Sequence, residues 1–349
     1  MSEYFNIRFG DKLLRLVALL ALLLVAAGML TSCSSDDEHI PEVPEPQVVF
    51  LFSPGGLGDM SYNDGILRGL QQFKKDNPTT DVFMSSPQSL AEAERIFSDW
   101  LDRPVGNIPV LFVLGSSDYL PMAEKLLATK SLTDNKYLLL FETNRDFGDP
   151  HISTFRISMY GASYLAGCCA SQLDGGRSLV VLGNNNDAII QVARDGFVAG
   201  HGDGCGVEAL ADDWTGYVQA TETYHRMEQW SDNYGFIFPV AGGSNAGIYR
   251  YSREFDDCPY LAGMDTDQSS LSNRITGSVI KRIDLLVYEY LSQWQKTYTL
   301  PEANTYGLES SYADWLLADR YKAELQQIVN RARQQAIASE KQYYETAAH

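Results

Sequence analysis

The sequence predicts an α/β protein made of two doubly wound lobes, each built on a parallel sheet. Short apolar runs alternate with longer amphipathic segments along the chain, which is the pattern of βα units. The runs are too many for one small sheet, and they divide into two sets around residues 156–160. With 349 residues, 45% of them apolar, the chain is long enough to form two lobes of ordinary domain size.

The apolar runs give eight candidate strands: 48–53, 81–86, 109–115, 137–142, 153–158, 178–183, 234–240 and 260–265. The amphipathic segments give candidate helices near 64–76, 89–102, 119–130, 160–173, 187–200, 217–231, 245–254 and 278–297. A last helix is expected from Ser311 to about Lys341, because its apolar side chains fall near one helical face. The two halves show no clean repeat of identical residues, so any similarity between the lobes would be structural only.

The first 32 residues have the pattern of a signal peptide. Three basic residues precede an apolar run of 14 residues, "VALLALLLVAAGML", which is shorter than the roughly 20 residues that a membrane-spanning helix needs. The run ends at "LTSC", which resembles the lipobox of bacterial lipoproteins. That resemblance implies that Cys33 becomes the first residue of the mature protein and carries a lipid; a structural cysteine is the alternative.

Residues 33–46 are expected to form the lipidated cysteine and an extended tether. They are rich in acidic residues and proline, and they show no apolar periodicity. The acidic residues after Cys33 also resemble the surface-export signal of some Gram-negative lineages, and a solvated spacer is the other interpretation. The protein would therefore be lipid-anchored to a membrane in the cell envelope, on the periplasmic side or on the outer surface.

The charge and the cysteine and histidine positions argue against several classes of function. The formal charge of −18 disfavours binding to nucleic acid. The spacing of cysteines and histidines supports no metal site, no cofactor is indicated, and no histidine has a recognisable nucleophile partner, so an enzyme is disfavoured. An oxidising compartment would permit Cys205 to pair with Cys258, a question that the sequence leaves open.

The glycine-rich segment "GGLGDMSYN" follows the first candidate strand and precedes a helix. It lacks the lysine of a Walker loop and the third glycine of a dinucleotide-binding fingerprint. What remains is a turn at which the backbone can approach a ligand, with Asp59, Ser61, Tyr62 and Asn63 at the helix start. Ser61 or Asn63 could instead simply cap that helix.

Five blocks resemble the basic membrane protein family of lipoproteins, the purine nucleoside receptor-like substrate-binding proteins of ABC transporters. The blocks occur in the family's order: "GGLGDMSYNDGILRGL", "YGASYLAG", "PVAGGSNAGIYRYSRE", "LAGMDTDQ" and "ITGSVIKRID". The resemblance implies a periplasmic-binding-protein type I fold with three crossovers at the hinge between the lobes. The first lobe would hold residues 47–157 and 265–297, and the second residues 158–264 and 298–349.

The resemblance also implies the residues of a nucleoside site. Tyr62 matches the family's aromatic residue that stacks on the purine, and Trp214 is the best match for a second aromatic from the opposite lobe. Asp265 matches the carboxylate that accepts ribose hydroxyls, and Lys281 matches the lysine that donates to the same sugar. The remaining matched positions are Asp59, Asn63, Asp118 and Gly242.

These residue types suit a neutral nucleoside. Aromatic rings can cover the flat base, while a carboxylate and a lysine can bond the vicinal hydroxyls of the sugar and neutralise each other. Gly58 and Met60 stand where the family often has an acid and a lysine, so the first loop lacks one polar contact. In the alternative interpretation Asp265 caps a turn, Tyr62 and Trp214 are core aromatics, and Lys281 pairs with Asp284.

The expected function is therefore capture of a nucleoside, purine in the first instance, by a monomeric solute-binding protein that delivers it to an ABC permease. No chemistry on the ligand is expected. The alternatives are a ligand-sensing or adhesive surface lipoprotein, and a binding protein for a different small polar solute.

Overall fold

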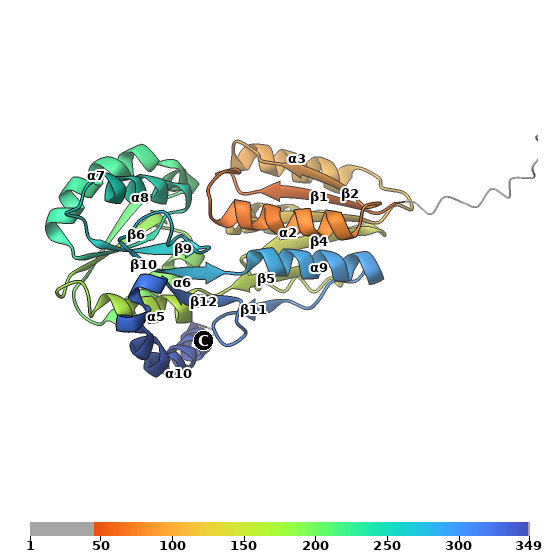
Figure 1. Ribbon diagram of the computed structural model, residues 1–349. Helices are drawn as coiled ribbons and strands as arrows, with labels where there is room; N and C mark the ends of the chain where they lie inside the picture. Colours follow the sequence, from red (N-terminus) through yellow and green to blue (C-terminus); the bar gives the residue numbers. More distant parts are fainter. Residues whose placement is uncertain (1–44, 348–349) are drawn as a thin grey trace, which may run out of the picture. The chain divides into compact units, whose positions relative to one another are not determined.

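The computed structural model describes residues 45–347, which contain two six-stranded sheets (Figure 1). The predicted signal peptide, Cys33 and nearly all of the tether lie outside the described residues. The first sheet has the order β11-β5-β4-β3-β1-β2, and every neighbouring pair is parallel. Its strands are β1 (Gln47–Phe52), β2 (Asp81–Ser85), β3 (Val110–Gly115), β4 (Lys136–Phe141), β5 (Ile152–Ile157) and β11 (Asn304–Tyr306).

The second sheet has the order β12-β10-β9-β8-β6-β7. Its pairs are parallel except for the antiparallel pair of β10 with β12. Its strands are β6 (Ser178–Asn184), β7 (Cys205–Ala211), β8 (Phe236–Val240), β9 (Tyr260–Asp265), β10 (Ile275–Lys281) and β12 (Ala313–Leu317).

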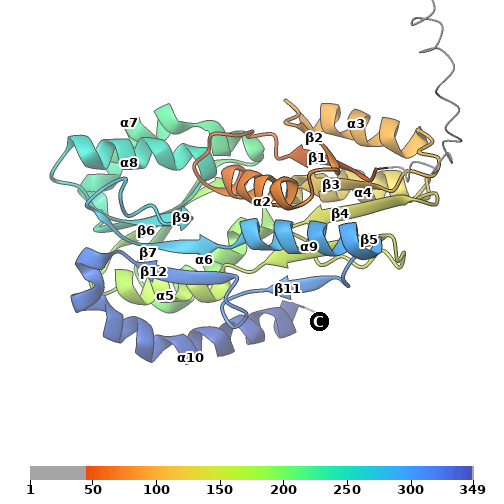
Figure 2. The same cartoon turned by 45° about the vertical axis from the view of Figure 1, so that its right-hand side comes forward.

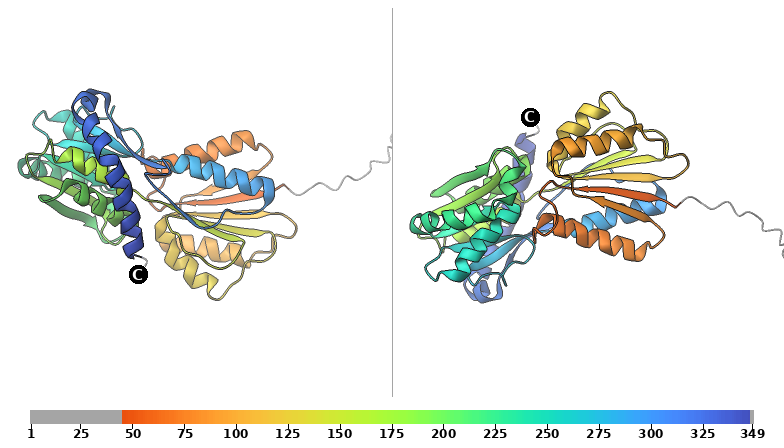
Figure 3. Two further views of the ribbon diagram at one scale, coloured as in Figure 1. Left: turned by 90° about the horizontal axis from the view of Figure 1, so that it is seen from below. Right: turned by 90° about the horizontal axis from the view of Figure 1, so that it is seen from above.

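Helices cover both faces of each sheet, as Figure 3 shows for the first sheet. The first lobe has α2 (Tyr62–Asp76), α3 (Leu90–Asp102), α4 (Leu120–Leu127) and α9 (Ile283–Thr297). The second has α5 (Tyr160–Ala170), α6 (Ala188–His201), α7 (Ala220–Asn233), α8 (Asn245–Glu254) and α10 (Lys322–Ala347). Short 3₁₀ turns are η1 (Ser117–Tyr119), η2 (Trp214–Val218), η3 (Gly242–Ser244) and η4 (Asp319–Tyr321). Several of these helices pack on one another: α2 on α9, α3 on α4, α5 on both α6 and α10, and α7 on α8.

The cores confirm the doubly wound architecture. In β1, Phe50 and Phe52 pack in one cluster with residues of α2 and α9, whereas Leu51 between them packs in another cluster with residues of α3 and α4. In β6, Val180 and Leu182 belong to the first of these clusters. Leu179 and Val181, which alternate with them in the chain, pack in a third cluster with residues of α7 and α8. Successive side chains of a strand point to opposite faces, so each of these strands is buried on both.

The chain crosses between the two sheets three times, as the family resemblance implies. It leaves the first sheet after β5, returns after β10 into α9, and crosses again between β11 and β12 (Figure 2). Each lobe is therefore assembled from segments that are distant in the sequence.

Four strands were not predicted: β7, β10, β11 and β12. The helix expected at 278–297 begins only at Ile283, and the helix expected from Ser311 begins only at Lys322. The segments that replace them are strands because each completes a sheet. In β12 the side chains of Ala313, Trp315 and Leu317 are buried, and the residues between them are more exposed. Burial thus repeats every two residues, as in a strand, and not every 3.6 residues, as in a helix.

The sheet memberships also differ from the predicted division into lobes. Residues 265–297 were assigned to the first lobe, but β10 within them pairs in the second sheet. Residues 298–349 were assigned to the second lobe, but β11 within them pairs in the first. The chain returns to the first lobe only after β10 ends at Lys281, and it enters the second lobe again only after β11 ends at Tyr306, so both crossings come later than expected.

Cys205 and Cys258 are free thiols. Cys205 begins β7, and Cys258 lies just before β9, with β6 and β8 between those two strands. Three strand spacings amount to about 14 Å. A disulfide needs Cα atoms within about 7 Å, so the sheet order itself prevents this bridge.

Candidate functional site

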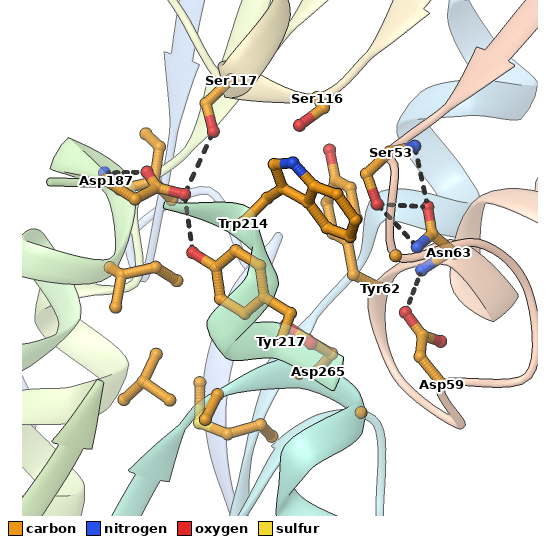
Figure 4. A pocket seen from close by; sticks show the side chains of 18 of the residues that line it. Ser53, Asp59, Tyr62, Asn63, Ser116, Ser117, Asp187, Trp214, Tyr217 and Asp265 are labelled. Carbon is orange, nitrogen blue, oxygen red and sulfur yellow. Dashed lines mark hydrogen bonds between the residues drawn. The ribbon is translucent and has the colours of Figure 1, made fainter. Parts of the chain in front are cut away.

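A cavity of about 260 Å³ lies between the carboxyl ends of the two sheets (Figure 4). Its lining comes from the segments that follow β1, β3, β4, β5 and β8, from the ends of β9 and β10, from the first turns of α2 and α6, and from η2. Ligands of open α/β sheets collect at the carboxyl ends of strands. Both lobes therefore present the edge at which such sheets bind small molecules.

The structure brings all of the predicted ligand-binding residues to this cavity. The lining includes Asp59, Tyr62, Asn63, Asp118, Trp214, Gly242, Asp265 and Lys281. These residues are separated by up to about 220 positions in the chain, and their convergence results from the order of strands in the two sheets.

The glycine loop is organised by Asp59. Its carboxylate accepts hydrogen bonds from the backbone N–H groups of Ser61 (2.9 Å), Asn63 (2.8 Å) and Asp64 (3.2 Å). Burial raises the pKa of Asp59, and these backbone hydrogen bonds oppose that rise. The side chain of Ser61 makes no capping bond, so the start of α2 is held by Asp59 and not by Ser61 or Asn63.

The amide of Asn63 is fixed against the end of β1. Its Nδ2 donates to the Ser53 hydroxyl at 2.7 Å, and its Oδ1 accepts from the Ser53 backbone N–H at 3.2 Å. The side chain lies at the cavity wall with one amide N–H left for a ligand.

Two aromatic side chains enter the cavity from opposite lobes. Tyr62 is the first residue of α2, and Trp214 is the first residue of η2. Figure 4 shows both rings within the cavity, with Tyr217 close to Trp214. The Lys281 ammonium lies 4.8 Å from the centre of the Tyr62 ring, within the range of a cation–π interaction.

Lys281 forms a buried ion pair with Glu142, a residue that the sequence analysis missed. Lys281 Nζ and Glu142 Oε1 are 2.8 Å apart, and each side chain is 3% exposed. The alternative of a surface pair between Lys281 and Asp284 is wrong, because Arg282 pairs with Asp284 at 3.2 Å. The mutual neutralisation expected of Asp265 and Lys281 needs correction too, since Glu142 is the direct partner of the lysine.

Asp265 is held by a hydroxyl from the opposite lobe. Its carboxylate accepts a short hydrogen bond from the side chain of Ser61. Burial raises the pKa of Asp265, while the charge of Lys281 and the hydroxyl of Ser61 lower it. The carboxylate thus keeps oxygen lone pairs that face the cavity.

A second pair of acids lines the other end of the cavity. Asp187 accepts hydrogen bonds from Tyr217 Oη at 2.9 Å and from Ser117 Oγ at 3.2 Å, and it caps α6 through the Ile189 N–H. Burial, followed by the charge of Asp187, raises the pKa of Asp118 to about 6. Asp118 therefore takes up a proton as the pH falls through about 6.

The missed residues follow the same positional rule as the predicted ones. Glu142 ends the predicted strand 137–142, and Asp187 begins the predicted helix 187–200. Both are therefore at the carboxyl edge of a sheet, which is the signal that would have found them. Tyr217 carried no such signal: it begins the expected helix 217–231, but no strand was predicted before it, and the structure places it in η2 after β7.

Among residues 45–347 no group of three histidine, cysteine or acidic side chains could hold a metal ion. None of the helices in the same range is long and apolar enough to cross a membrane.

Two α/β lobes joined by three crossings, with a cavity between the carboxyl ends of their strands, form the type I periplasmic-binding-protein fold. The family model of PnrA-like ABC transporter substrate-binding proteins (Bmp) matches residues 46–346. The chain belongs to this family, whose members bind substrates for ABC transporters outside the cytoplasm and are not enzymes.

The chain is also similar to individual proteins, and the solved structures among them share its fold. Basic membrane protein D of Borreliella burgdorferi is 21% identical over 313 residues, covering 87% of each chain. A solute-binding protein of an ABC transporter system from Aeropyrum pernix has a TM-score of 0.66 at 18% identity, covering 85% of this chain and 90% of that one. A carbohydrate transporter from Acidothermus cellulolyticus in complex with myo-inositol has a TM-score of 0.56 at 11% identity, covering 83% and 99%.

Proposed function

We propose that this protein is lipid-anchored through Cys33 and captures a nucleoside, purine in the first instance, between its lobes for delivery to an ABC-type permease. The observation that carries the proposal is the presence of Tyr62 and Trp214, from opposite lobes, in one cavity with Asp265 and Lys281. Ring faces stabilise a flat base. A carboxylate and an ammonium form strong charge-assisted hydrogen bonds with the hydroxyls of a sugar.

The charges of the cavity favour a neutral ligand. The lining residues that the structure describes include Lys281 as their basic side chain and a larger set of acids: Asp59, Asp118, Glu142, Asp187 and Asp265. An anionic group brought among these acids would be repelled in surroundings of low dielectric constant. A nucleoside therefore fits this cavity better than a nucleotide does.

The size of the cavity is consistent with a ligand of one base and one sugar. Small-molecule sites range from about 300 to 1,000 Å³, and this cavity of about 260 Å³ is close to the lower end. An oligosaccharide or a peptide would need more room.

A different small polar solute is the second candidate. Carboxylates bind the hydroxyls of sugars and polyols as well as those of ribose, and a solved structure with this fold is described in complex with myo-inositol. The candidates differ in the need for a flat ring, because a polyol does not need both Tyr62 and Trp214.

Calorimetry of the full chain in detergent micelles tests the ligand. The panel contains purine and pyrimidine nucleosides, free bases, nucleoside 5′-monophosphates, sugars, myo-inositol and amino acids. We expect heat from purine nucleosides and none from the monophosphates. Heat from sugars, polyols or amino acids alone would overturn the nucleoside assignment and leave the solute-binding class in place.

The lipid anchor has a separate test. In cells supplied with a radioactive fatty acid, we expect label on the protein and its recovery with membranes. The variant Cys33→Ser is expected to lose both. A labelled Cys33→Ser protein would contradict the anchor without bearing on the ligand.

A further inference from the structure

Glu142 occupies the same place in the first lobe as Asp265 occupies in the second. Counted from β2, β4 is the fourth strand of its sheet; counted from β7, β9 is the fourth strand of the other. Glu142 follows the last residue of β4, and Asp265 is the last residue of β9. The two lobes thus contribute one acid each, from equivalent strand ends, to the lining of one cavity.

Both acids have left-handed backbone conformations. The φ angle is +61° at Glu142 and +64° at Asp265. Such a conformation costs a non-glycine residue roughly 1–2 kcal/mol and persists where the surroundings require a side chain at that point. Both residues are buried, with 6% of Glu142 and 9% of Asp265 exposed.

The two carboxylates differ in their partners. Glu142 Oε1 is 2.8 Å from the Lys281 ammonium, whereas the carboxylate of Asp265 accepts a hydrogen bond from the Ser61 hydroxyl. Burial raises the pKa of both acids, and the charge of Lys281 opposes that rise in each, so the ammonium acts on both. Burial, followed by the charge of Glu142, raises the pKa of Tyr62, although no hydrogen bond of ordinary geometry joins the Tyr62 hydroxyl to Glu142.

A buried ammonium needs a countercharge, because taking an unpaired charge out of water costs several kcal/mol. If Glu142 were neutral, Asp265 would be the nearby acid left to balance Lys281. The lysine and the aspartate would then satisfy each other, and neither would be free for the hydroxyls of a ligand.

We propose that Glu142 is a positioning residue of the binding site, which holds the Lys281 ammonium against the Tyr62 ring so that Lys281 and Asp265 remain a separate donor and acceptor. This inference rests on the proposed nucleoside function for its effect on the sugar. Its effect on Lys281 belongs to the ligand-free protein and is independent of the ligand.

The first experiment measures the pair without ligand. Thermal unfolding of the full chain in detergent is compared for Glu142→Gln, Lys281→Met and the double variant. We expect each single variant to have a lower Tm than the unaltered protein. We expect the decrease in Tm of the double variant to be clearly smaller than the sum of the two single decreases. Additive losses would show that the pair is not coupled and would overturn the inference.

The second experiment measures discrimination between inosine and 2′-deoxyinosine. The measured quantity is the ratio of the affinity for inosine to the affinity for 2′-deoxyinosine. We expect this ratio to fall at least fivefold in Glu142→Gln, toward the ratio of Asp265→Asn, and to be partly restored in Glu142→Asp. A merely structural role would weaken both ligands equally and leave the ratio unchanged. An unchanged ratio in Glu142→Gln, alongside a reduced ratio in Asp265→Asn, would overturn the inference.

Asp174→Asn is the matched control. Asp174 is a buried carboxylate with hydrogen bonds to Ser178 Oγ (2.7 Å) and His201 Nε2 (2.6 Å), and it is not among the residues that line the cavity. We expect a lower Tm and an unchanged ratio. If the unaltered protein binds neither nucleoside, the proposed function fails, while the unfolding cycle still decides whether Glu142 and Lys281 are coupled.

Discussion

Two acids of the second lobe that line the cavity accept hydrogen bonds from hydroxyls of the first lobe. Ser61 of the first lobe donates to Asp265, and Ser117 of the first lobe donates to Asp187. Hydrogen bonds to a charged group contribute about 1.5–3 kcal/mol, more than bonds between neutral groups. A few hydroxyls therefore determine where the negative charges of this site stand.

Removing one ring or one carboxylate should weaken ligand binding without unfolding the protein. For Tyr62→Ala and for Asp265→Ala we expect a loss of about 1–3 kcal/mol in binding free energy, from one lost stack or one unpaired polar group. Calorimetry with the best ligand of the panel measures this. Tyr62→Phe keeps the ring and should bind nearly as well as the unaltered protein; equal binding by Tyr62→Ala would exclude stacking on this residue.

Asp118 should make stability fall as the pH rises through the acidic range. The folded protein holds a proton on Asp118 up to a pKa of about 6, whereas the unfolded chain releases it near pH 3.9. Between these values the folded state binds more protons, so its stability decreases with pH.

The variant Asp118→Asn removes this dependence. Thermal unfolding should show no gain at pH 4 and a gain of about 1–2 kcal/mol at pH 7, after allowance for partial solvent screening. An equal gain at both pH values would mean that the charge of Asp118 is not the cause.

Single residues at strand ends could be predicted because of a simple rule of topology. The carboxyl ends of parallel strands meet at one edge, so Asp118, Asp265 and the glycine loop could be placed there from the sequence. The partners of those residues could not be predicted. Which acid reaches Lys281 depends on the register between two lobes, and no local pattern in the chain encodes it.

At the scale of elements, α5 and α6 cross at backbone contact. A Cβ atom on Gly196 would lie 2.2 Å from the carbonyl oxygen of Tyr160, and one on Gly200 would lie 2.0 Å from that of Tyr164. Real Cβ atoms do not approach so closely, so these glycines allow the helices to touch. The start of α6 then reaches the cavity with Asp187 and Ile189.

Gly196→Val should separate the two helices. We expect a loss of at least about 1–3 kcal/mol in unfolding free energy, the usual cost of overpacking, together with weaker ligand binding because the first turn of α6 shifts. Ala199→Val is the control, since it places the same side chain on the exposed face of this helix. Equal losses in the two variants would exclude the contact between α5 and α6 as the cause, because Gly196→Val does not lower helix propensity whereas Ala199→Val does.

The elements that the sequence analysis missed share one physical property. In β10, Ile275, Val279 and Ile280 can be fitted to a helical face or to a strand, because a short apolar run has no decisive period. The deciding influence is the neighbouring β9, which offers a free edge of backbone N–H and C=O groups. Tertiary pairing of this kind is not visible in local propensity.

At the scale of the whole described chain, polar contacts join the lobes around the cavity. Besides the bonds from Ser61 and Ser117, Gln268 Nε2 donates to the Met60 carbonyl at 3.1 Å. A binding protein that closes by hinge motion must break such contacts to open. They stabilise the arrangement in which both lobes line the cavity.

The double variant Ser61→Ala, Ser117→Ala should shift the protein toward a more open form. We expect at least about tenfold weaker ligand binding, since two hydrogen bonds to acids, each of about 1.5–3 kcal/mol, favour the closed arrangement. Small-angle X-ray scattering should show a larger radius of gyration without ligand and the original value when the ligand is saturating. Ser131→Ala, at an exposed position, is the control, and an unchanged radius in the double variant would contradict this role.

The three crossings also determine the order in which the nascent chain can fold. The first sheet lacks its edge until β11 at 304–306 has been made, and the second lacks its edge until β12 at 313–317 follows. Ribosomes add about 5–20 residues per second, so the polypeptide is nearly complete before either half can mature. Synthesis from the N-terminus therefore delays maturation of both halves to the same late moment.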